Sequence, residues 1–327
     1  MPEVIVDHAL CTGCGTCADF CPVEVFEMRG NGNGRLYANP IRQENCWACD
    51  TCVGQCKRNA IQIIETGDEI AAKSQRDTAT ARPIPHSEKQ LYASWHETLR
   101  TVLGLRWAPV AIKLIPQGDP LPDVPMPRTK LRYCQSLMMA RRGKSLLMPA
   151  QCHACPDGTH ILGLTEIPPK LASGELYLHF KKLASMDAAR QMIAERPRLP
   201  EKSMQATLVT PLNKAVLTPD VVAVIAQPEQ MMWLTMASSF YTGHRSTFQI
   251  SGYNAQCVET TLIPYTSGEF NLSLGCYGCR ASSDVSDDLM FMGVPIGQMP
   301  DLIRGLESLG RKAIPDSRNK VYLPPNI

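Results

Sequence analysis

The sequence has no long apolar segment and almost no net charge, and each absence excludes a class of protein. The longest purely apolar run covers residues 221–226, which is far too short to cross a bilayer and predicts a buried strand. The 33 Lys and Arg residues nearly balance the 31 Asp and Glu residues, so the formal charge of +2 gives no general attraction to nucleic acid or to an acidic membrane. No glycine-rich dinucleotide fingerprint follows a predicted strand, and a bound NAD or flavin is therefore not indicated.

The beginning of the chain shows no secretory leader. Met1, Pro2 and Glu3 run directly into an apolar strand, whereas a leader would place a charged segment before a longer apolar stretch. We therefore expect a cytoplasmic protein.

Cysteine is abundant, with 14 residues, and eight of them form two runs with the same spacing, Cys-x2-Cys-x2-Cys-x3-Cys. The first run is Cys11, Cys14, Cys17 and Cys21, and the second is Cys46, Cys49, Cys52 and Cys56. Thiolates two residues apart can wrap one corner of an iron-sulfur cube from a tight loop, while the fourth cysteine points toward a neighbouring cube. The duplicated spacing therefore indicates electron transfer.

Residues 1–66 resemble two-cluster bacterial ferredoxins. The first run ends in Cys21-Pro22, as the ferredoxin signature requires, whereas the second ends in Cys56-Lys57 and departs from it. The resemblance implies two [4Fe-4S] clusters with crossed ligands. One cluster is assigned to Cys11, Cys14, Cys17 and Cys56, and the other to Cys46, Cys49, Cys52 and Cys21. Free thiolates reserved for iron imply a reducing compartment and an anaerobic or microaerobic host.

Zinc and structural disulfides are the alternatives for these cysteines. Zinc sites usually show two CxxC pairs separated by a finger-length spacer, which two complete four-cysteine runs do not resemble. The flanking segments fit the small ferredoxin fold, because residues 4–6 and 61–64 predict short strands that pair as its outer ribbon. Residues 30–34 form a Gly/Asn turn between apolar segments and predict a hairpin insertion, not a phosphate loop.

We expect an α+β fold in which a linker joins the small ferredoxin-like domain to a larger mixed α/β domain. Residues 67–90 are polar, with hardly any large apolar side chain after Ile70, as is typical of a linker. Residues 91–327 form the expected second domain. One predicted helix begins near residue 91, and two others cover residues 228–241 and 298–309. The predicted strands cover residues 107–115, 145–148, 206–210, 221–226 and 247–250.

The second domain carries the other six cysteines, four of them in two CxxC loops. The loops pair Cys152 with Cys155 and Cys276 with Cys279, and the remaining two are Cys134 and Cys257. A lone cysteine is more often a small buried hydrophobic residue than a ligand. Two CxxC loops beside a ferredoxin favour a metal site.

Five segments of the second domain stand out together, namely Leu103-Gly-Leu-Arg-Trp-Ala-Pro-Val-Ala-Ile-Lys113, Arg132-Tyr-Cys-Gln-Ser-Leu137, His153-Ala-Cys-Pro156, Pro228-Glu-Gln-Met-Met-Trp233 and Asn271-Leu-Ser-Leu-Gly-Cys-Tyr-Gly278. Through these segments, residues 90–312 resemble the domain of unknown function 169 family. The resemblance implies one site with four recurring cysteines, which match Cys134, Cys155, Cys257 and Cys276. Cys152 and Cys279 stand where other residues are usual in that family. The family supplies no reaction.

These features predict an iron-sulfur oxidoreductase. A low-potential donor protein would feed the two N-terminal clusters, which would pass electrons to a third cluster, [4Fe-4S] or larger, where a small molecule is reduced. The ligands expected for it are Cys134, Cys155, Cys257 and Cys276, with Cys152 or Cys279 as an additional metal ligand or a proton donor. The candidate catalytic residues are Lys113, Arg132, His153, Tyr277 and Arg280. For Lys113 the alternative is a strand-end lysine in solvent, and for His153 it is a structural role.

A basic segment favours an anionic substrate. Residues 124–156 contain no Asp or Glu, but they contain Arg128, Lys130, Arg132, Arg141, Arg142 and Lys144. Such a cluster could offset the charge of thiolate-bound iron and attract a carboxylate, phosphate or sulfur oxyanion, or it could equally be a solvated face that meets an acidic protein. Nucleic acid is disfavoured, because Tyr133 is the only Phe, Tyr or Trp in the segment.

Two other functions stay open. The chain could be an electron-transfer subunit whose second domain docks on a partner oxidoreductase, or a sulfur- or metal-handling protein that assembles clusters or removes sulfur. The expected partners are a low-potential electron donor or acceptor protein and a small-molecule substrate, with no nucleic acid and no membrane. A homo-oligomer is left open.

Overall fold

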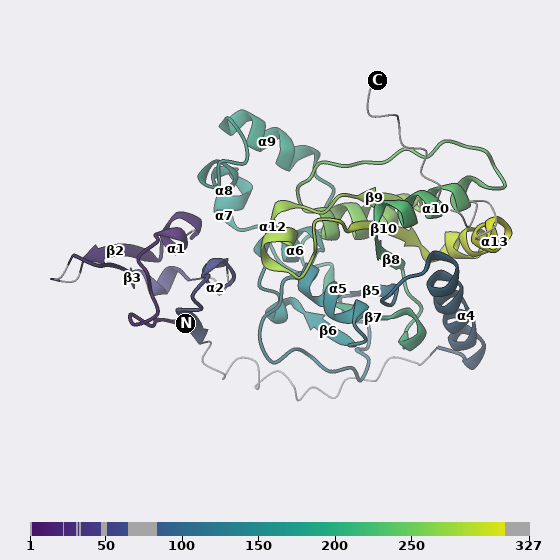
Figure 1. Cartoon of the computed structure of the whole chain (residues 1–327), viewed down its shortest axis with the longest axis horizontal. Coiled ribbons are helices and arrows are strands. Elements are labelled where there is room, and N and C mark those ends of the chain that lie inside the picture. Colours follow the sequence, from purple (N-terminus) through teal and green to yellow (C-terminus); the bar gives the residue numbers. More distant parts are fainter. Residues whose placement is uncertain are drawn as a thin grey trace, which may run out of the picture.

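The computed structural model describes residues 2–21, 23–30, 32, 34–46, 51–64 and 84–310. A small N-terminal unit lies against one side of a larger domain, and helices α7 to α9 extend beside it (Figure 1). Most of the expected linker lies outside the described residues. Helix α4 (His86–Leu103) begins five residues before the expected start of the second domain. Within the described ranges, no helix is both long and apolar enough to cross a membrane.

The N-terminal unit is built from two antiparallel pairs and two short helices. Strand β1 (Glu3–Val6) pairs with β4 (Ile61–Ile64), so the predicted ribbon is confirmed. The predicted hairpin is confirmed as β2 (Phe26–Gly30) paired with β3 (Leu36–Pro40), followed by the 3-10 turn η1 (Gln43–Asn45). Helix α1 (Thr16–Phe20) ends at the fourth cysteine of the first run, and α2 (Thr51–Gln55) ends just before the fourth cysteine of the second.

The second domain contains a six-stranded sheet in the order β6-β7-β5-β8-β10-β9, in which every neighbouring pair is antiparallel. The strands are β5 (Val110–Pro116), β6 (Leu146–Pro149), β7 (Met204–Pro211), β8 (Val221–Ala226), β9 (Asn271–Ser273) and β10 (Met290–Pro295). An antiparallel sheet with helices packed on it gives the α+β fold that the sequence predicts.

Helices cover both faces of this sheet, and strand β8 shows why. Its residues Val221, Ala223 and Ile225 pack into one core, while Val222 and Val224 pack into a second core on the opposite face. Both faces of β8 are therefore buried, which explains its uninterrupted apolar sequence. Helices α4, α10 (Pro228–Ser239) and α13 (Met299–Leu309) contribute to the second core, and α5 (Tyr133–Arg141) and the π-helix η4 (Ala255–Leu262) contribute to the first.

The remaining elements lie mostly on the side of α5 and η4. They are η2 (Ala150–Cys152), α6 (Pro156–Ile161), α7 (Pro169–Ala172), α8 (Glu175–His179), α9 (Met186–Glu195), η3 (Leu212–Lys214), α11 (Ile263–Ser267), α12 (Tyr277–Ser282) and η5 (Ile296–Gln298). Helices α7, α8 and α9 enclose a small apolar core of their own around Leu171, Tyr177, Ala189 and Ile193.

The strand predicted at residues 247–250 is wrong. The backbone of this segment forms hydrogen bonds with a side chain and not with a neighbouring strand. The Gln249 N–H donates to Asn271 Oδ1, and the Asn271 amide donates to the Gln249 carbonyl. Strand β10 was not predicted, because Gly293 interrupts the apolar run in its sequence. A Cβ atom at Gly293 would collide with the Thr260 carbonyl, so glycine is what lets η4 pack directly on the sheet.

Candidate functional site

A cavity of about 190 Å³ lies between the N-terminal unit and the second domain. Five of the six second-domain cysteines line it, namely Cys134, Cys155, Cys257, Cys276 and Cys279. Phe20 and Gln55 line the same cavity from the N-terminal unit. Each of these two residues directly precedes a ferredoxin cysteine, Cys21 and Cys56. The fold thus brings together thiols that are far apart in the sequence and places them next to the N-terminal unit.

Four short helices present the thiols, each from its first turn or N-cap. Cys155 is the N-cap of α6, where its Sγ accepts a hydrogen bond from the Gly158 N–H at 3.4 Å. Cys276 is the N-cap of α12, and its Sγ accepts from the Cys279 N–H at 3.3 Å. Cys134 lies in the first turn of α5, and Cys257 lies in the first turn of η4. Backbone N–H groups at a helix start favour a thiolate, which is the form that binds metal.

Three of the thiols are in contact with one another. Cys276 Sγ and Cys279 Sγ lie 2.9 Å apart, and Cys134 packs in the same small cluster. A hydrogen bond from the Cys279 thiol lowers the pKa of Cys134, whereas burial raises the pKa of Cys279 well above its usual value. One proton shared among close sulfurs accounts for these opposite shifts.

The other two thiols are held in the neutral form chiefly by burial. Burial raises the pKa of Cys155 to about 11 and raises the pKa of Cys257 well above its usual range. Arg132 acts in the opposite direction on Cys155, and Arg196 acts in the opposite direction on Cys257. A bound cation or cationic cluster would add to these two guanidinium groups and release the thiol protons.

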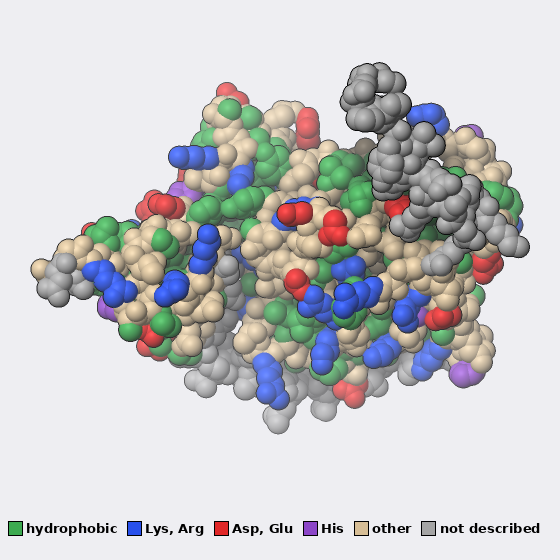
Figure 2. Space-filling view, viewed as in Figure 1, with side chains coloured by type: hydrophobic (Ala, Val, Ile, Leu, Met, Phe, Trp, Pro, Cys, Tyr) green, Lys and Arg blue, Asp and Glu red, His purple; other side chains and the backbone are tan. Residues whose placement is uncertain are grey.

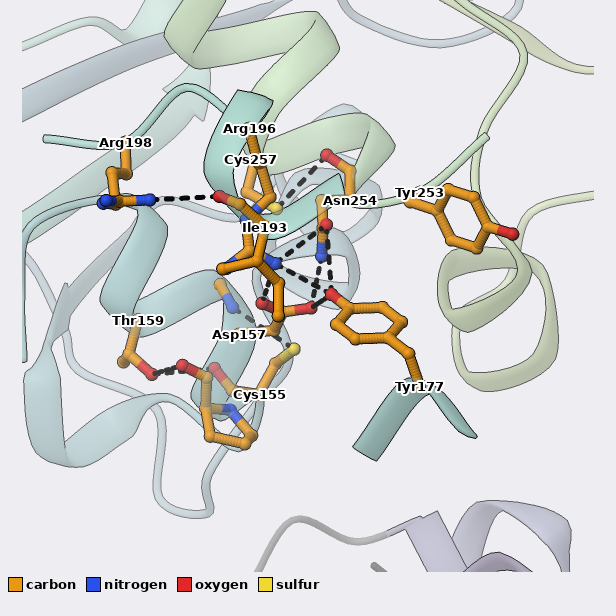
Figure 3. A network of polar contacts seen from close by, with 12 residues as sticks. Cys155, Asp157, Thr159, Tyr177, Ile193, Arg196, Arg198, Tyr253, Asn254 and Cys257 are labelled. Carbon is orange, nitrogen blue, oxygen red and sulfur yellow. Dashed lines mark hydrogen bonds and ion pairs between the residues drawn. The ribbon is translucent and has the colours of Figure 1, made fainter. Parts of the chain in front are cut away.

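A buried polar network supports the segments that carry Cys155 and Cys257 (Figure 3). Arg196 Nη1 donates to Asp157 Oδ1 at 2.6 Å, to Tyr177 Oη at 2.8 Å and to Asn254 Oδ1 at 3.2 Å. Asp157 Oδ2 also accepts from the Tyr177 hydroxyl at 2.6 Å and from the Asn254 amide. Asp157 follows Cys155 in α6, and Asn254 precedes Cys257 at the start of η4. The network therefore ties two thiol-bearing elements to helix α8 and to the segment after α9.

The charges in this network are matched despite their burial. The side chains of Arg196 and Asp157 are only 4% and 14% exposed. Burial works to lower the pKa of Arg196, but Asp157, Tyr177 and Cys257 together raise it. Burial, followed by the nearby Asp157 carboxylate, raises the pKa of Tyr177. Arg196 therefore stays charged, and Tyr177 keeps its proton.

Several aromatic side chains line the cavity. Phe20 stacks on Phe180 with ring centroids 6.3 Å apart, which joins the two parts of the protein. Lys182 Nζ lies 3.3 Å from the centroid of the Tyr277 ring, and the Tyr253 hydroxyl donates to the Lys182 carbonyl at 2.7 Å.

The structure places two of the five predicted catalytic residues at the cavity. Arg132 and Tyr277 line it, and Tyr277 is half exposed. Lys113 Nζ instead donates to Asp220 Oδ1 at 2.7 Å, and this ion pair joins β5 to the start of β8. Lys113 is not among the cavity-lining residues.

His153 and Arg280 also lie away from the cavity lining. His153 is buried, its Nε2 donates to the Met148 carbonyl at 3.0 Å, and burial lowers its pKa to about 4. It is therefore a neutral histidine at pH 7. The Arg280 guanidinium donates to the Ser286, Leu274 and Leu289 carbonyls, which fixes the loop after α12.

The structure also separates the two additional cysteines. Cys279 lines the cavity, whereas Cys152 is buried in the core on the α5 side of the sheet, and its carbonyl accepts from the Leu131 N–H. The cavity therefore has one cysteine more than a four-cysteine site needs.

The basic segment does not gather at the cavity. Among its six Lys and Arg residues, only Arg132 lines it. Arg142 lies over the Trp107 ring, 5.7 Å from the centroid, and pairs with Asp284. Burial lowers the pKa of Arg141 to about 10. Figure 2 shows Lys and Arg side chains over the part of the second domain that holds α5, β5, β6 and β7.

The ferredoxin-type cysteines show the same local geometry in both runs. The Val25 N–H donates to Cys21 Sγ and the Ala60 N–H donates to Cys56 Sγ, both at 3.3 Å and both from four residues downstream. Cys14 is exposed, while Cys11, Cys17, Cys21 and Cys52 are buried. Cys49 lies outside the described residues. N–H groups that donate to cluster sulfurs are one of the means by which proteins set the potential of an iron-sulfur cluster.

The second-domain thiols suit a multi-iron cluster by their chemistry. Across the ranges that the structure describes, no three His, Cys, Asp or Glu side chains gather as ligands of a single metal ion. In a cubane each thiolate binds a different iron, so its ligands need not meet at one point. Among the described residues that line the cavity, the His, Cys, Asp and Glu side chains are the five thiols and Asp157, and Asp157 is engaged by Arg196.

Sequence reasoning missed the residues that complete the site. They are Phe20, Asp157, Tyr177, Phe180, Lys182, Arg196, Asn254 and Gln256. Asp157 and Gln256 stand two and one residues from a predicted cysteine ligand, and that proximity was an available signal. Tyr177 and Arg196 had no such signal, because only the folded chain brings α8 and the segment after α9 to the cysteines.

Two protein families match the chain, one in each part. The DUF169 family, described as uncharacterised ArCR, matches residues 98–305, and the 4Fe-4S dicluster domain matches residues 10–60. No solved structure matches the chain.

Among curated proteins, both parts have relatives in Methanocaldococcus jannaschii. Uncharacterized protein MJ0308 of this organism is 26% identical over 61% of this chain and 86% of its own length. Its uncharacterized ferredoxin MJ0722 is 43% identical over 19% of this chain and 77% of its own length. An iron-sulfur subunit of its CoB--CoM heterodisulfide reductase is 33% identical over 21% of this chain but only 12% of its own length.

Proposed function

Because this chain belongs to the DUF169 family and carries a ferredoxin-type 4Fe-4S dicluster domain, we propose that it is an iron-sulfur oxidoreductase. The N-terminal domain transfers electrons. It passes them to a third iron-sulfur cluster held by second-domain cysteines, and that cluster reduces a small anionic molecule.

One observation carries this proposal. The cavity that collects five second-domain thiols is also lined by Phe20 and Gln55, which directly precede Cys21 and Cys56. Cys21 and Cys56 are the fourth cysteines of the two runs, each assigned to the cluster of the opposite run. The electron-carrying part of the chain therefore adjoins the thiols of the proposed third cluster.

The proposed ligands are Cys134, Cys155, Cys257 and Cys276, with Cys279 as the additional thiol. Bound iron would supply a one-electron redox centre. The chain's own residues exclude water with the aromatic lining of the cavity and orient Cys155 and Cys257 through the Asp157 network. Cys279 keeps its proton beside Cys134 and Cys276, and could deliver it to a reduced substrate. Arg132 and Lys182 supply the positive charge that an anionic substrate needs.

Spectroscopy of the full chain tests this proposal. Anaerobically prepared wild-type protein, reduced in steps, should show paramagnetic signals from three clusters. Cys257→Ser should remove one set of signals and leave the two ferredoxin sets unchanged. Cys152→Ser, a matched cysteine outside the cavity, should keep all three. Only two sets in the wild-type protein, or the same three in Cys257→Ser, would contradict the proposal.

A second function has one observation in its favour. The N-terminal part is similar to segments of heterodisulfide reductase proteins, which by their names are subunits of larger enzymes. The chain would then be an electron-transfer subunit that docks on a partner oxidoreductase. Purification under mild anaerobic conditions separates the two functions, because the docking form should keep a stoichiometric partner and the self-contained enzyme should not.

A further inference from the structure

Among the described residues that line the cavity, Gln256 is the one whose buried side-chain polar atoms lack a hydrogen-bond partner. It lines the cavity, is only 1% exposed and stands between Asn254 and Cys257. Both atoms of its side-chain amide, Oε1 and Nε2, are buried without a hydrogen-bond partner in the part of the chain that the structure describes. A buried amide that is left unpaired is costly, so its retention calls for an explanation.

Two buried polar side chains near η4 are hydrogen-bonded, whereas Thr260 Oγ1 of η4 and the Nε and Nη2 atoms of Arg196 have no partner among the described residues, as is the case for the Gln256 amide. The Asn271 amide donates to the Gln249 and Glu259 carbonyls and accepts from the Gln249 N–H. The buried Glu259 carboxylate accepts from the Ser251 N–H and the Ser273 hydroxyl, both at 2.6 Å. Gln256 has no comparable anchor for its side chain. An apolar side chain of similar size would serve the packing at lower cost.

The backbone around Gln256 is fixed even though its amide is unpaired. The Gln256 carbonyl accepts from the Thr261 hydroxyl at 2.8 Å within the π-helix η4. π-helical turns occur frequently at functional sites, where they re-aim side chains. The segment therefore holds Gln256 in a fixed place beside the thiol of Cys257.

From these observations we propose that Gln256 recognises the substrate and that the substrate carries an amide edge, with an N–H donor and a C=O acceptor side by side. This inference rests on the proposed function for the location of the substrate. A carboxylate or a cluster sulfide accepts hydrogen bonds but cannot donate one, and so would leave Oε1 unpaired. An amide edge satisfies Oε1 and Nε2 together.

The walls of the cavity favour a small planar molecule. Tyr177, Phe180, Tyr253 and Tyr277 line it and offer flat apolar surface. Arg132 and Lys182 accommodate an anionic substituent away from the amide edge. The inferred substrate class is a small, flat molecule that carries a carboxamide or cyclic amide.

Two ring compounds of equal charge and nearly equal shape test this inference on the full chain. Nicotinamide carries a carboxamide, and 3-acetylpyridine replaces its NH₂ with CH₃ while keeping the C=O acceptor. Calorimetry should show that wild-type protein binds nicotinamide about tenfold or more tightly than 3-acetylpyridine. Gln256→Met should abolish this preference. Gln117→Met, an exposed glutamine away from the cavity lining, should keep it.

A thermal unfolding curve checks that Gln256→Met is folded, and Gln256→Glu provides a second variant of the same shape. Gln256→Glu keeps an acceptor but loses the amide donor, so it should also lose the preference. The inference is wrong if wild-type protein binds neither compound or binds both equally. The inference is also wrong if Gln256→Met keeps the preference for nicotinamide, even if the substitution changes the reduction potential of the third cluster. Loss of iron in Cys134→Ala tests the third cluster separately, because Gln256→Met should leave the iron content unchanged.

Discussion

Arg196 and Asp157 form a buried ion pair, with Nη1 and Oδ1 2.6 Å apart, that joins the segment after α9 to the helix beginning at Cys155. The Asp157 carboxylate accepts three hydrogen bonds in this network, and these bonds stabilise its negative charge. The pair couples the small α7–α9 core to the cysteine site. A buried pair of this kind is costly to break from one side, because the remaining charge is left without a partner.

Arg196→Met should therefore lower the free energy of unfolding by about 3–5 kcal/mol. Arg190→Met is the matched control, because Arg190 pairs with Asp187 on the surface of α9 with both side chains mostly exposed. The control should change stability by no more than about 0.5 kcal/mol. Urea unfolding measures both variants. Equal midpoints for wild type and Arg196→Met would show that the network does not support the site.

Cys279 and Cys152 should respond differently to the same substitution. Cys279→Ser should alter the absorption and paramagnetic spectra of the third cluster, because Cys279 contacts Cys276 and Cys134. Cys152→Ser should leave these spectra unchanged but lower the free energy of unfolding by about 1–3 kcal/mol, because it places a hydroxyl in an apolar core. The reverse outcome would place the additional ligand at Cys152.

The Phe20 and Phe180 contact should matter for electron transfer between the two parts of the chain. Phe20→Ala removes the ring that stacks on Phe180 and lines the cavity, and it should slow reduction of the third cluster severalfold while both ferredoxin clusters stay intact. Ile64→Ala, which truncates an exposed apolar residue on β4, is the control. Stopped-flow reduction under anaerobic conditions gives the rates. An unchanged rate in Phe20→Ala would contradict this role.

Acid stability should depend on His96 in helix α4. Burial, followed by the nearby Arg100, lowers the pKa of His96, so the unfolded chain binds a proton more readily than the folded chain. The stabilisation is fully present above the ordinary histidine pKa of about 6.5 and is lost as pH falls through the lower folded value. His96→Phe should therefore unfold with a weaker dependence on pH below about 6.5. The exposed His244→Phe should keep the wild-type dependence.

The sequence predicted those features that depend on local pattern. The repeated cysteine spacing located the ferredoxin-like unit, and short apolar runs located β1, β4 and β8. The CxxC loops predicted a metal site, and three of their four cysteines line the cavity. Spacing alone could not distinguish Cys152 from Cys279, because both loops have the same spacing and tertiary packing decides which thiol lines the cavity.

The features that the sequence did not predict depend on side chains that meet only in the folded chain. Lys113, in a buried strand, was predicted to be a catalytic residue, yet it forms an ion pair with Asp220, which lies more than a hundred residues away in the sequence. Residues 247–250 have the apolar alternation of a strand, but the Asn271 side chain takes the hydrogen bonds of Gln249. Tyr177 lies in the short helix α8 and Arg196 directly follows α9, with no motif at either position, and their place at the site follows from the docking of α8 and α9.

Iron and sulfide content per chain is the most direct test of the third cluster. Anaerobically reconstituted full-length protein should hold roughly twelve irons and twelve sulfides, four of each in three cubanes, and Cys134→Ala or Cys276→Ala should reduce both counts to roughly eight. A wild-type count of roughly eight that neither substitution changes would contradict the account and leave the N-terminal ferredoxin domain as the only redox centre.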